Sequence, residues 1–335
     1  MLFKLKILPL QIIRGSKPWR NTAPQRYKNF AKRQRVGNES LNYMQQRRLR
    51  FAIFGNTYQA KSAETVSKFL NCVARHGGEV CIERDFHKYL SRQHDLAIDA
   101  AEVFSGTYFD ANFVVSMGGD GTLLKAANYV GARQLPIIGV NTGRLGFLAD
   151  TTTEEIEATV DAIFDGNFST EEHAVIEVKG NISGSPFALN DIAVLKRDNA
   201  SMISITASIN GEYLTTYQAD GLIVATPTGS TAYSLSNGGP IVAPQSGIIC
   251  LTPVAPHSLN VRPIVIPDTA EITLSVESRS HNFLVAIDGR SEKCLEGTTL
   301  TIRRAAHTIK IMRLFGRNYY STLREKMMWG KDNRN

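Results

Sequence analysis

Ser116-Met117-Gly118-Gly119-Asp120-Gly121-Thr122 is the stretch that decides the fold of this 335-residue chain. It follows the apolar run 113–115, which predicts a buried strand, and it precedes residues 123–128, which predict the start of a helix. Three glycines therefore lie at a strand-to-helix turn. At such a turn the backbone N–H groups can approach a phosphate closely, and the helix N-terminus favours negative charge. The stretch predicts an anion site.

Asp120 is the unusual residue of this turn, because a carboxylate repels phosphate. It fits an anion site only if it orients a metal or accepts a proton from an attacking hydroxyl. The competing interpretation is a tight turn in which Asp120 caps the helix N-terminus. The motif alone leaves both interpretations open.

Residues 50–147 alternate strand and helix. The apolar spacing predicts strands at 50–55, 80–82, 113–115 and 135–140, helices at 63–76 and 90–104, and a loop at 141–147. Such alternation is typical of a Rossmann-like α/β domain with a parallel sheet, in which ligands bind at the carboxyl ends of the strands. The Gly-rich turn lies at that edge.

The second half of the chain is rich in predicted strands. After a helix at 153–164, strand-like runs occupy 174–179, 187–195, 201–210, 213–217, 247–252, 271–276, 283–288, 298–303 and 308–314. Asn210-Gly211 is a hairpin turn signal. Residues 318–329 predict a helix that packs back on the first domain. We therefore expect an α/β N-terminal Rossmann-like domain at 48–150, a β-rich domain at 151–310 and a C-terminal segment at 311–335.

Residues 1–47 form a basic leader without helical or strand periodicity. Residues 1–43 hold ten Lys and Arg against one acid, Glu39, so the rest of the chain carries a net charge of −2 out of a total of +7. A nucleic-acid partner is therefore not expected. The leader is a basic tail, an organelle transit peptide or the product of a mis-assigned start, and we favour the last, with Met44 as the start.

The cysteine and hydropathy patterns argue against a zinc protein, a membrane protein and a secreted protein. The four cysteines, Cys72, Cys81, Cys250 and Cys294, show no zinc-ligand spacing and predict buried or free thiols in a reducing compartment. No apolar run approaches the roughly 20 residues that span a bilayer, and the N-terminus lacks a secretory cleavage site. We expect a cytoplasmic protein without a membrane partner.

Two further clusters carry polar chemistry. Residues 219–236 predict a buried strand, a Pro-Thr-Gly turn and a hydroxyl-rich helix start. The neutral hydroxyls of this segment suit adenine and ribose, and the Tyr233 ring offers a surface for stacking. The alternative interpretation is a Ser/Thr helix cap with Tyr233 in the core. Asn190-Asp191, expected at the end of a strand-like run, suits ribose hydroxyls, although alone such a pair is more often a turn.

Taken together and in order, these elements resemble the NAD kinase family from about residue 50 to the C-terminus. The matching stretches are Gly118-Gly119-Asp120-Gly121-Thr122, Asn141-x-Gly-x-Leu145-Gly146-Phe147, Asn190-Asp191, Asp220-Gly221, Thr226 to Ser236, Asn237-Gly238-Gly239-Pro240 and Pro253 to Pro263. Lipid kinases and, loosely, phosphofructokinases share the first stretch. Thr226 to Tyr233 is far more specific. The resemblance implies an NAD kinase/diacylglycerol kinase-like architecture.

The resemblance implies transfer of the ATP γ-phosphoryl group to the adenosine 2′-hydroxyl of NAD, with a divalent cation, Mg²⁺, on the ATP phosphates. Asp120 is the implied general base, Gly121 lines the pocket and Lys125 meets phosphate charge, unless that lysine is simply solvated. No side chain is assigned as a metal ligand. The implied dinucleotide contacts are Asn190, Asp191, Asp220, Thr231, Ala232, Tyr233, Ser234, Leu235, Ser236 and Ala255. Ala255 matches a position that in some relatives reaches substrate across a subunit interface, which implies a homodimer or homotetramer.

Arg290 departs from the family pattern, because many relatives carry Gln after Asp288-Gly289. Whether Arg290 contacts substrate, meets phosphate or faces solvent is therefore not decided by the resemblance. The chain has no Walker A motif. The alternatives are a lipid kinase of the diacylglycerol or sphingosine type, disfavoured by Asn190-Asp191 and Thr231 to Ser236, and a non-catalytic dinucleotide sensor, disfavoured by Asp120.

Overall fold

A computed structural model describes residues 48–57, 62–93, 102–143, 146–198, 201–314 and 318–330. The predictions for the leader at 1–47 lie outside these residues. These described residues belong to one compact unit. The domain boundaries expected from the sequence stay predictions, because one sheet runs through both halves of this unit.

The first half contains a parallel sheet in the order β5-β4-β1-β2-β3 with helices on both faces. Its elements are β1 (Arg50–Gly55), α3 (Ser62–Arg75), β2 (Glu79–Glu83), α4 (Arg84–Gln93), β3 (Glu102–Phe104), β4 (Phe113–Gly118), α5 (Asp120–Val130), η1 (Gly131–Arg133), β5 (Ile137–Asn141) and α6 (Ile156–Phe164). Alternate residues of β1 face opposite sides. Phe51 and Ile53 pack with α3 and α6, whereas Ala52 and Phe54 pack with α5.

The second half is almost entirely antiparallel. Its elements are β6 (Phe168–Lys179), β7 (Phe187–Ala188), β8 (Asp191–Lys196), β9 (Ile203–Ile209), β10 (Glu212–Ala219), β11 (Gly221–Ala225), η2 (Thr228–Thr231), α7 (Tyr233–Ser236), β12 (Ile248–Val254), β13 (Ile264–Pro267), β14 (Ile272–Glu277), β15 (Asn282–Ile287), β16 (Arg290–Leu295), β17 (Thr299–Leu314) and α8 (Tyr319–Met327). Strands β13-β12-β11-β8-β15-β16 form a six-stranded sheet. Its apolar face packs against β9, β14 and β17 to make the larger core.

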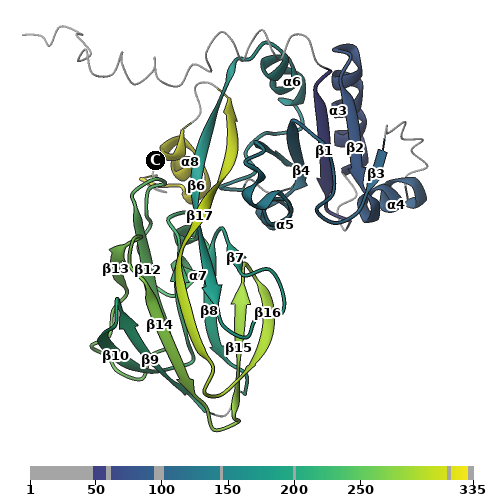
Figure 1. The fold of residues 1–335 in the computed structure, drawn as a ribbon. Coiled ribbons are helices and arrows are strands. Elements are labelled where there is room, and N and C mark those ends of the chain that lie inside the picture. The colour runs from purple at the N-terminus through teal and green to yellow at the C-terminus, as the bar shows by residue number, and fades with distance from the viewer. Residues whose placement is uncertain are drawn as a thin grey trace, which may run out of the picture. The chain divides into compact units, whose positions relative to one another are not determined.

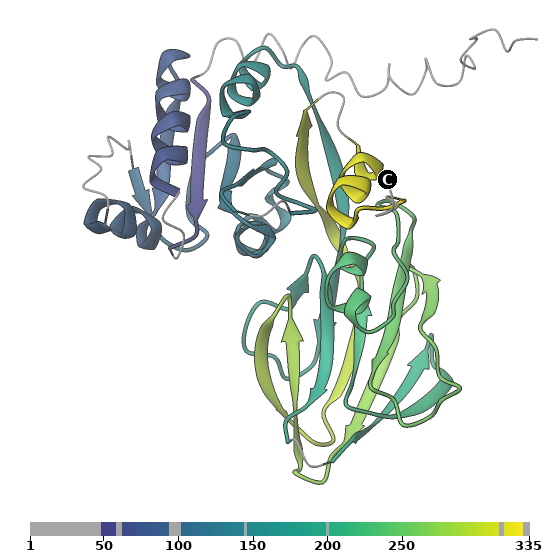
Figure 2. The same ribbon diagram turned by 180° about the vertical axis from the view of Figure 1, so that it is seen from behind.

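The long strand β17 joins the parallel and antiparallel parts. It runs beside β6 along most of its length (Figure 1 and Figure 2). At Thr299–Ile302 it also pairs with β14, and at Ile311 it pairs with β5. Residues near the C-terminal end of β17 are therefore brought next to the carboxyl ends of β4 and β5, where the Gly-rich turn begins.

The structure corrects four expectations from the sequence. Residues 102–104, expected in a helix from 90, form β3, because this segment adds an edge strand to β2 and buries Phe104 against Phe54. The two strands expected at 298–303 and 308–314 are one strand with an irregularity between Arg304 and Thr308. Strands β13 and β16 were not expected. Asp191 begins β8 and does not end a strand.

The remaining helices and the cysteines agree with the sequence. Helices α3, α5, α6 and α8 confirm those expected near 63–76, 123–128, 153–164 and 318–329. All four cysteines are buried and unpaired. Within the described part of the chain, no helix combines the length and the apolar character needed to cross a membrane.

Candidate active site

The Gly-rich turn connects β4 to α5, as expected. Gly118 is sterically required, because a Cβ there would lie 2.3 Å from the Thr122 hydroxyl. At Gly119 and Gly121, by contrast, a Cβ would meet no atom within 4 Å. Packing within this chain therefore does not explain these two glycines. They leave open space at a helix N-terminus, where a phosphate fits.

Asp120 is held by a second loop and does not cap its own helix. The N-cap of α5 is Gly119, and no side chain caps it, so the capping interpretation is wrong. Asp120 Oδ1 accepts hydrogen bonds from the N–H groups of Leu148 (3.1 Å) and Ala149 (3.0 Å), and Oδ2 accepts one from Phe147 (2.9 Å). Gly146 lies against the same carboxylate. A Cβ there would be 2.0 Å from Oδ1.

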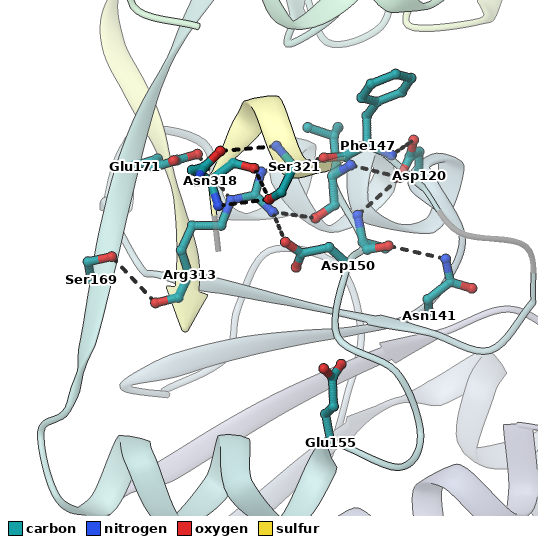
Figure 3. A network of polar contacts seen from close by, with 12 residues as sticks. Asp120, Asn141, Phe147, Asp150, Glu155, Ser169, Glu171, Arg313, Asn318 and Ser321 are labelled. Atoms are coloured by element: carbon teal, nitrogen blue, oxygen red, sulfur yellow. Dashed lines mark hydrogen bonds and ion pairs between the residues drawn. The ribbon is translucent and has the colours of Figure 1, made fainter. Parts of the chain in front are cut away.

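Arg313, near the end of β17, holds the opposite side of the same loop (Figure 3). Its guanidinium donates to the carbonyls of Phe147 (3.4 Å) and Leu148 (3.5 Å) and pairs with Asp150 Oδ2 (2.5 Å). The Arg313 side chain is only 8% exposed. The loop is therefore fixed by Asp120 through its N–H groups and by Arg313 through its carbonyls, which restricts where the Asp120 carboxylate can lie.

Glu171 and His173 of β6 continue this network toward the second polar cluster. Arg313 Nε donates to Glu171 Oε2 (3.0 Å), and His173 Nε2 lies 3.6 Å from the same oxygen. Contacts with His173 and Arg313 hold the pKa of Glu171 down at about 2, while burial lowers the pKa of His173. The other His173 nitrogen is 2.8 Å from the hydroxyl of Thr228 in η2. Polar contacts thus connect the Asp120 loop with the Pro-Thr-Gly turn.

Asn190 and Asp191 lie beside a half-buried carboxylate, Asp288, that the sequence did not single out. Asp288 and Gly289 have positive φ angles of 47° and 79° and form the two-residue turn between β15 and β16. Asp288 accepts hydrogen bonds from the N–H groups of Leu189 (2.8 Å), Asn190 (2.8 Å) and Asp191 (3.2 Å). The Asn190 amide oxygen is buried without a hydrogen-bond partner, an arrangement that is costly unless a ligand donates to it.

Asp191 is partly protonated near neutral pH. Burial and the charge of Asp288 raise the pKa of Asp191 to about 7. Burial also raises the pKa of Asp288, but its three backbone hydrogen bonds and Arg290 oppose that shift. Arg290 itself is exposed and donates to the carbonyl of Phe187 (3.2 Å). With a pKa of about 7, Asp191 is partly protonated at neutral pH, and in that form it can donate a hydrogen bond.

We expect Asp191→Asn to change the pH dependence of stability. The folded protein holds the Asp191 proton more tightly than the unfolded chain, in which Asp titrates near pH 4. The stabilising contribution is therefore complete below about pH 4 and is lost as the pH rises through about 7. Urea unfolding from pH 4 to 8 should show the wild type losing stability relative to Asp191→Asn. A constant difference across this range would contradict the assignment.

The turn from Thr226 to Ser236 packs tightly onto Asn190. A Cβ at Gly229 would lie 2.0 Å from the Asn190 carbonyl oxygen, so only glycine fits. Two of the hydroxyls expected to face a nucleotide are instead buried in internal bonds: Ser230 binds the Pro227 carbonyl (2.6 Å), and Ser234 binds Thr252 (2.8 Å). Their role is to hold the turn.

Other residues of this turn remain accessible. Thr231, Ala232 and Leu235 are half-buried, while Ser236 is exposed. The Tyr233 ring is 40% exposed, so its placement in the core is wrong. The cap of α7 is Ala232, without a side-chain cap, so the Ser/Thr capping interpretation is wrong too. These side chains are available to a ligand.

Asp220 and Ala255 do not join this cluster. Both lie at the other end of β11, where Gly221 pairs with Leu195 and Val254; at the near end Ala225 pairs with Asp191. The two ends are about 14 Å apart for a strand of this length. Asp220 forms an ion pair with Lys196 (2.7 Å), and Ala255 is exposed with φ of 45°.

The two lysines near the turn face different groups. Lys125 lies about 140° around α5 from Asp120. Its Nζ is 3.9 Å from Glu83 Oε2 of β2. Lys326 of α8, which the sequence did not single out, has its Nζ 3.6 Å from Asp120 Oδ2.

Two family models match this chain. The ATP-NAD kinase N-terminal domain matches residues 51–168, which hold the Gly-rich turn, and the ATP-NAD kinase C-terminal domain matches residues 189–314. The chain belongs to the ATP-NAD kinase family. It is accordingly an ATP-dependent NAD kinase, and the α/β plus β-rich architecture expected from the sequence is confirmed.

Individual relatives agree with the NAD kinase assignment. The chain is 57% identical over 289 residues to an NAD kinase of Bacteroides fragilis, a match that covers 85% of this chain and all of the relative. An Archaeoglobus fulgidus NAD kinase solved in complex with ATP is 27% identical, with a TM-score of 0.66, and the match covers 82% of this chain and 99% of that one.

A third relative supports the fold alone. The yeast NADH kinase solved with NADH is 24% identical, with a TM-score of 0.77, and the match covers 86% of this chain and 90% of that one. None of these NAD kinase relatives supports the lipid kinase or the sensor alternative.

Proposed function

We propose that Asp120 is the general base for phosphorylation of the adenosine 2′-hydroxyl of NAD by ATP. The observation that carries this proposal is the carboxylate itself, fixed by three backbone N–H groups beside open space at Gly119 and Gly121. A base must be held within hydrogen-bond reach of the proton it takes. The loop at residues 146–150, which is held by both Asp120 and Arg313, supplies that constraint. The open space beside Gly119 and Gly121 admits the phosphate chain of ATP.

The reaction needs a base because a secondary alcohol is far too weak an acid to ionise at neutral pH. As the bond between the 2′-oxygen and the γ-phosphorus forms, the O–H bond breaks and its proton goes to Asp120. The bond between the γ-phosphorus and its bridging oxygen breaks, and its electron pair leaves with ADP. Positioning and charge neutralisation supply most of the acceleration in such transfers.

In this proposal the dinucleotide is bound by Asn190, Asp191 and the accessible residues of the turn from Thr226 to Ser236. The unpaired Asn190 amide oxygen accepts from a ribose hydroxyl, and Asp191, which is partly protonated near neutral pH, donates to the same region. The exposed Tyr233 ring offers a face for adenine. Thr231, Ala232, Leu235 and Ser236 line the remaining surface, and the buried Ser234 supports it.

A divalent cation, Mg²⁺, fits this site only as an ion carried by ATP. Among the described residues no group of three or more His, Cys, Asp and Glu side chains is arranged to hold a metal. Mg²⁺ commonly keeps several waters and binds substrate phosphates with one or two carboxylates. Asp120 is the carboxylate at this turn that would face it. The cation would neutralise charge on the transferred phosphoryl group.

A coupled assay for NADP, started with NAD, ATP and Mg²⁺, tests the function. We expect NADP to form, to carry its new phosphate on the adenosine ribose, and to stop forming when the cation is chelated. A purified protein that binds NAD without forming NADP would contradict the proposed reaction. Binding of neither nucleotide would contradict the proposed site as well.

We further propose that the active enzyme is a homodimer or homotetramer with shared sites. Asp220 and Ala255 lie about 17 Å along the strand direction from Asp191, five residues at the rise of a β-strand. If these residues and Asn190 all contact dinucleotide, Asp220 and Ala255 reach a site completed by another copy. Exposed Leu259, four residues beyond Ala255, is consistent with such an interface.

The compartment that we propose is the cytoplasm.

Mixing two inactive variants tests the shared site. Asp120→Asn and Asp220→Ala each remove one contributor. If Asp220 serves a neighbouring copy, mixed assemblies contain some sites with both native residues. In a dimer, random pairing makes half of the assemblies mixed, and one of the two sites in each mixed dimer holds both native residues. We therefore expect co-refolded mixtures to recover about a quarter of wild-type kcat. Light scattering gives the assembly size, and separately refolded variants are the control. No recovery in proven mixed assemblies would overturn the proposal.

A further inference from the structure

Lys326 brings a positive charge to the general base from the far end of the chain. Its Nζ lies 3.6 Å from Asp120 Oδ2 and 4.3 Å from the centre of the Phe147 ring. The Lys326 side chain is 28% exposed. A partly desolvated ammonium beside a carboxylate and over an aromatic face interacts more strongly than one in open solvent.

The fold of α8 fixes this position. Asn318 and Ser321 form a capping box at its N-terminus. The Tyr319 hydroxyl donates to the Val242 carbonyl (3.3 Å), and Thr322 and Leu323 are buried. The helix is therefore held by several contacts, and the location of Lys326 beside Asp120 does not depend on the ion pair alone.

Of the two lysines near the Gly-rich turn, Lys326 and not Lys125 places its positive charge beside Asp120. Lys125 is drawn to Glu83 on another strand, and its side chain is 45% exposed. Lys326 instead pairs with Asp120, the residue between Gly119 and Gly121 in the Gly-rich turn. A phosphoryl group transferred to a hydroxyl that contacts Asp120 must come close to the Lys326 ammonium as well.

We propose that Lys326 is a catalytic residue, whose ammonium binds the transferred phosphoryl group and then the 2′-phosphate of the product. This proposal rests on the proposed role of Asp120. Before transfer the ammonium pairs with the Asp120 carboxylate. When Asp120 takes the 2′-hydroxyl proton it becomes neutral, and the Lys326 ammonium pairs with the newly attached phosphate. No proton passes through Lys326, and charge is balanced at each stage.

The test compares Lys326→Met, Lys326→Arg and a control, Arg324→Met, which removes a positive charge from an exposed position of the same helix. We expect Lys326→Met to lower kcat by about 10²-fold, as for other lost transition-state contacts. Calorimetry should show NADP bound about tenfold more weakly and NAD bound as in the wild type. Lys326→Arg should recover most of both losses, and Arg324→Met should change neither.

The binding readout separates this proposal from the proposed function. Unchanged NADP affinity in Lys326→Met, equal losses for NAD and NADP, or the same losses in Arg324→Met would overturn the role of Lys326. A wild type that forms no NADP would instead overturn the proposed reaction. In that case the ratio of NADP to NAD affinity still decides whether Lys326 faces a 2′-phosphate.

Discussion

Asp120→Asn lowers kcat by about 10³-fold in our account, with little change in NAD affinity. Asparagine keeps the size of the side chain but cannot take the 2′-hydroxyl proton, and general bases contribute about 10²–10⁴-fold. Its amide oxygen still accepts some of the loop N–H groups that Asp120 now binds. The loop should therefore keep its place. Steady-state NADP formation and calorimetry with NAD measure the two effects separately.

Thermal unfolding is the control for Asp120→Asn, because the buried loop depends partly on this side chain. A variant that folds, binds NAD and keeps more than about a tenth of wild-type kcat would contradict the base assignment. A loss confined to NAD affinity would indicate that Asp120 positions substrate and takes no proton.

Gly146→Ala is the second substitution with a large expected effect, although residue 146 contributes no side chain to the chemistry. The added Cβ would lie 2.0 Å from Asp120 Oδ1 and 2.7 Å from its Cγ. Real Cβ atoms do not approach so closely, so the carboxylate or the loop must move by about an ångström. A displacement of that size costs about 10²-fold in rate when it misplaces a catalytic group. Single-turnover NADP formation measures this loss.

Gly184→Ala is the matched control. There too a Cβ would collide with a carboxylate oxygen, Glu292 Oε1, at 2.4 Å. Glu292, however, is a carboxylate of β16 that binds the exposed loop at Ser183 and Gly184, apart from the Asp120 loop. We expect near-normal kcat for this control. Equal rates for Gly146→Ala and the wild type would show that the loop does not set the position of Asp120.

The Gly-rich turn was predictable because its signals are local. A buried apolar run, glycines and a helical pattern follow one another within about a dozen residues, and parallel sheets place such turns at their ligand-binding edge. The same reasoning placed Asn190 and Asp191 in a polar cluster. It misjudged their position in the strand because β8 begins only where Asp288, from the turn between β15 and β16, binds the backbone.

The groups that support Asp120 were not predictable. Arg313 is 166 residues from Phe147 in sequence, and nothing in its surroundings marks it; only the pairing of β17 with β5 brings it to the loop. Lys326 lies 206 residues from Asp120 in sequence, and only the fold brings the two side chains together. Likewise the hydroxyl of Ser234 looks like a ligand donor in sequence, and its bond to Thr252 exists only in the folded sheet.

The most direct test of the central claim is a crystal structure of the Asp120→Asn variant with NAD and a non-hydrolysable ATP analogue. The decisive quantity is the distance from the side-chain oxygen at position 120 to the adenosine 2′-oxygen. We expect about 2.6–3.2 Å, the reach of a base to its proton, with the γ-phosphate in the open space beside Gly119 and Gly121. A 2′-hydroxyl that faces Asp191 or solvent, out of reach of position 120, would contradict it.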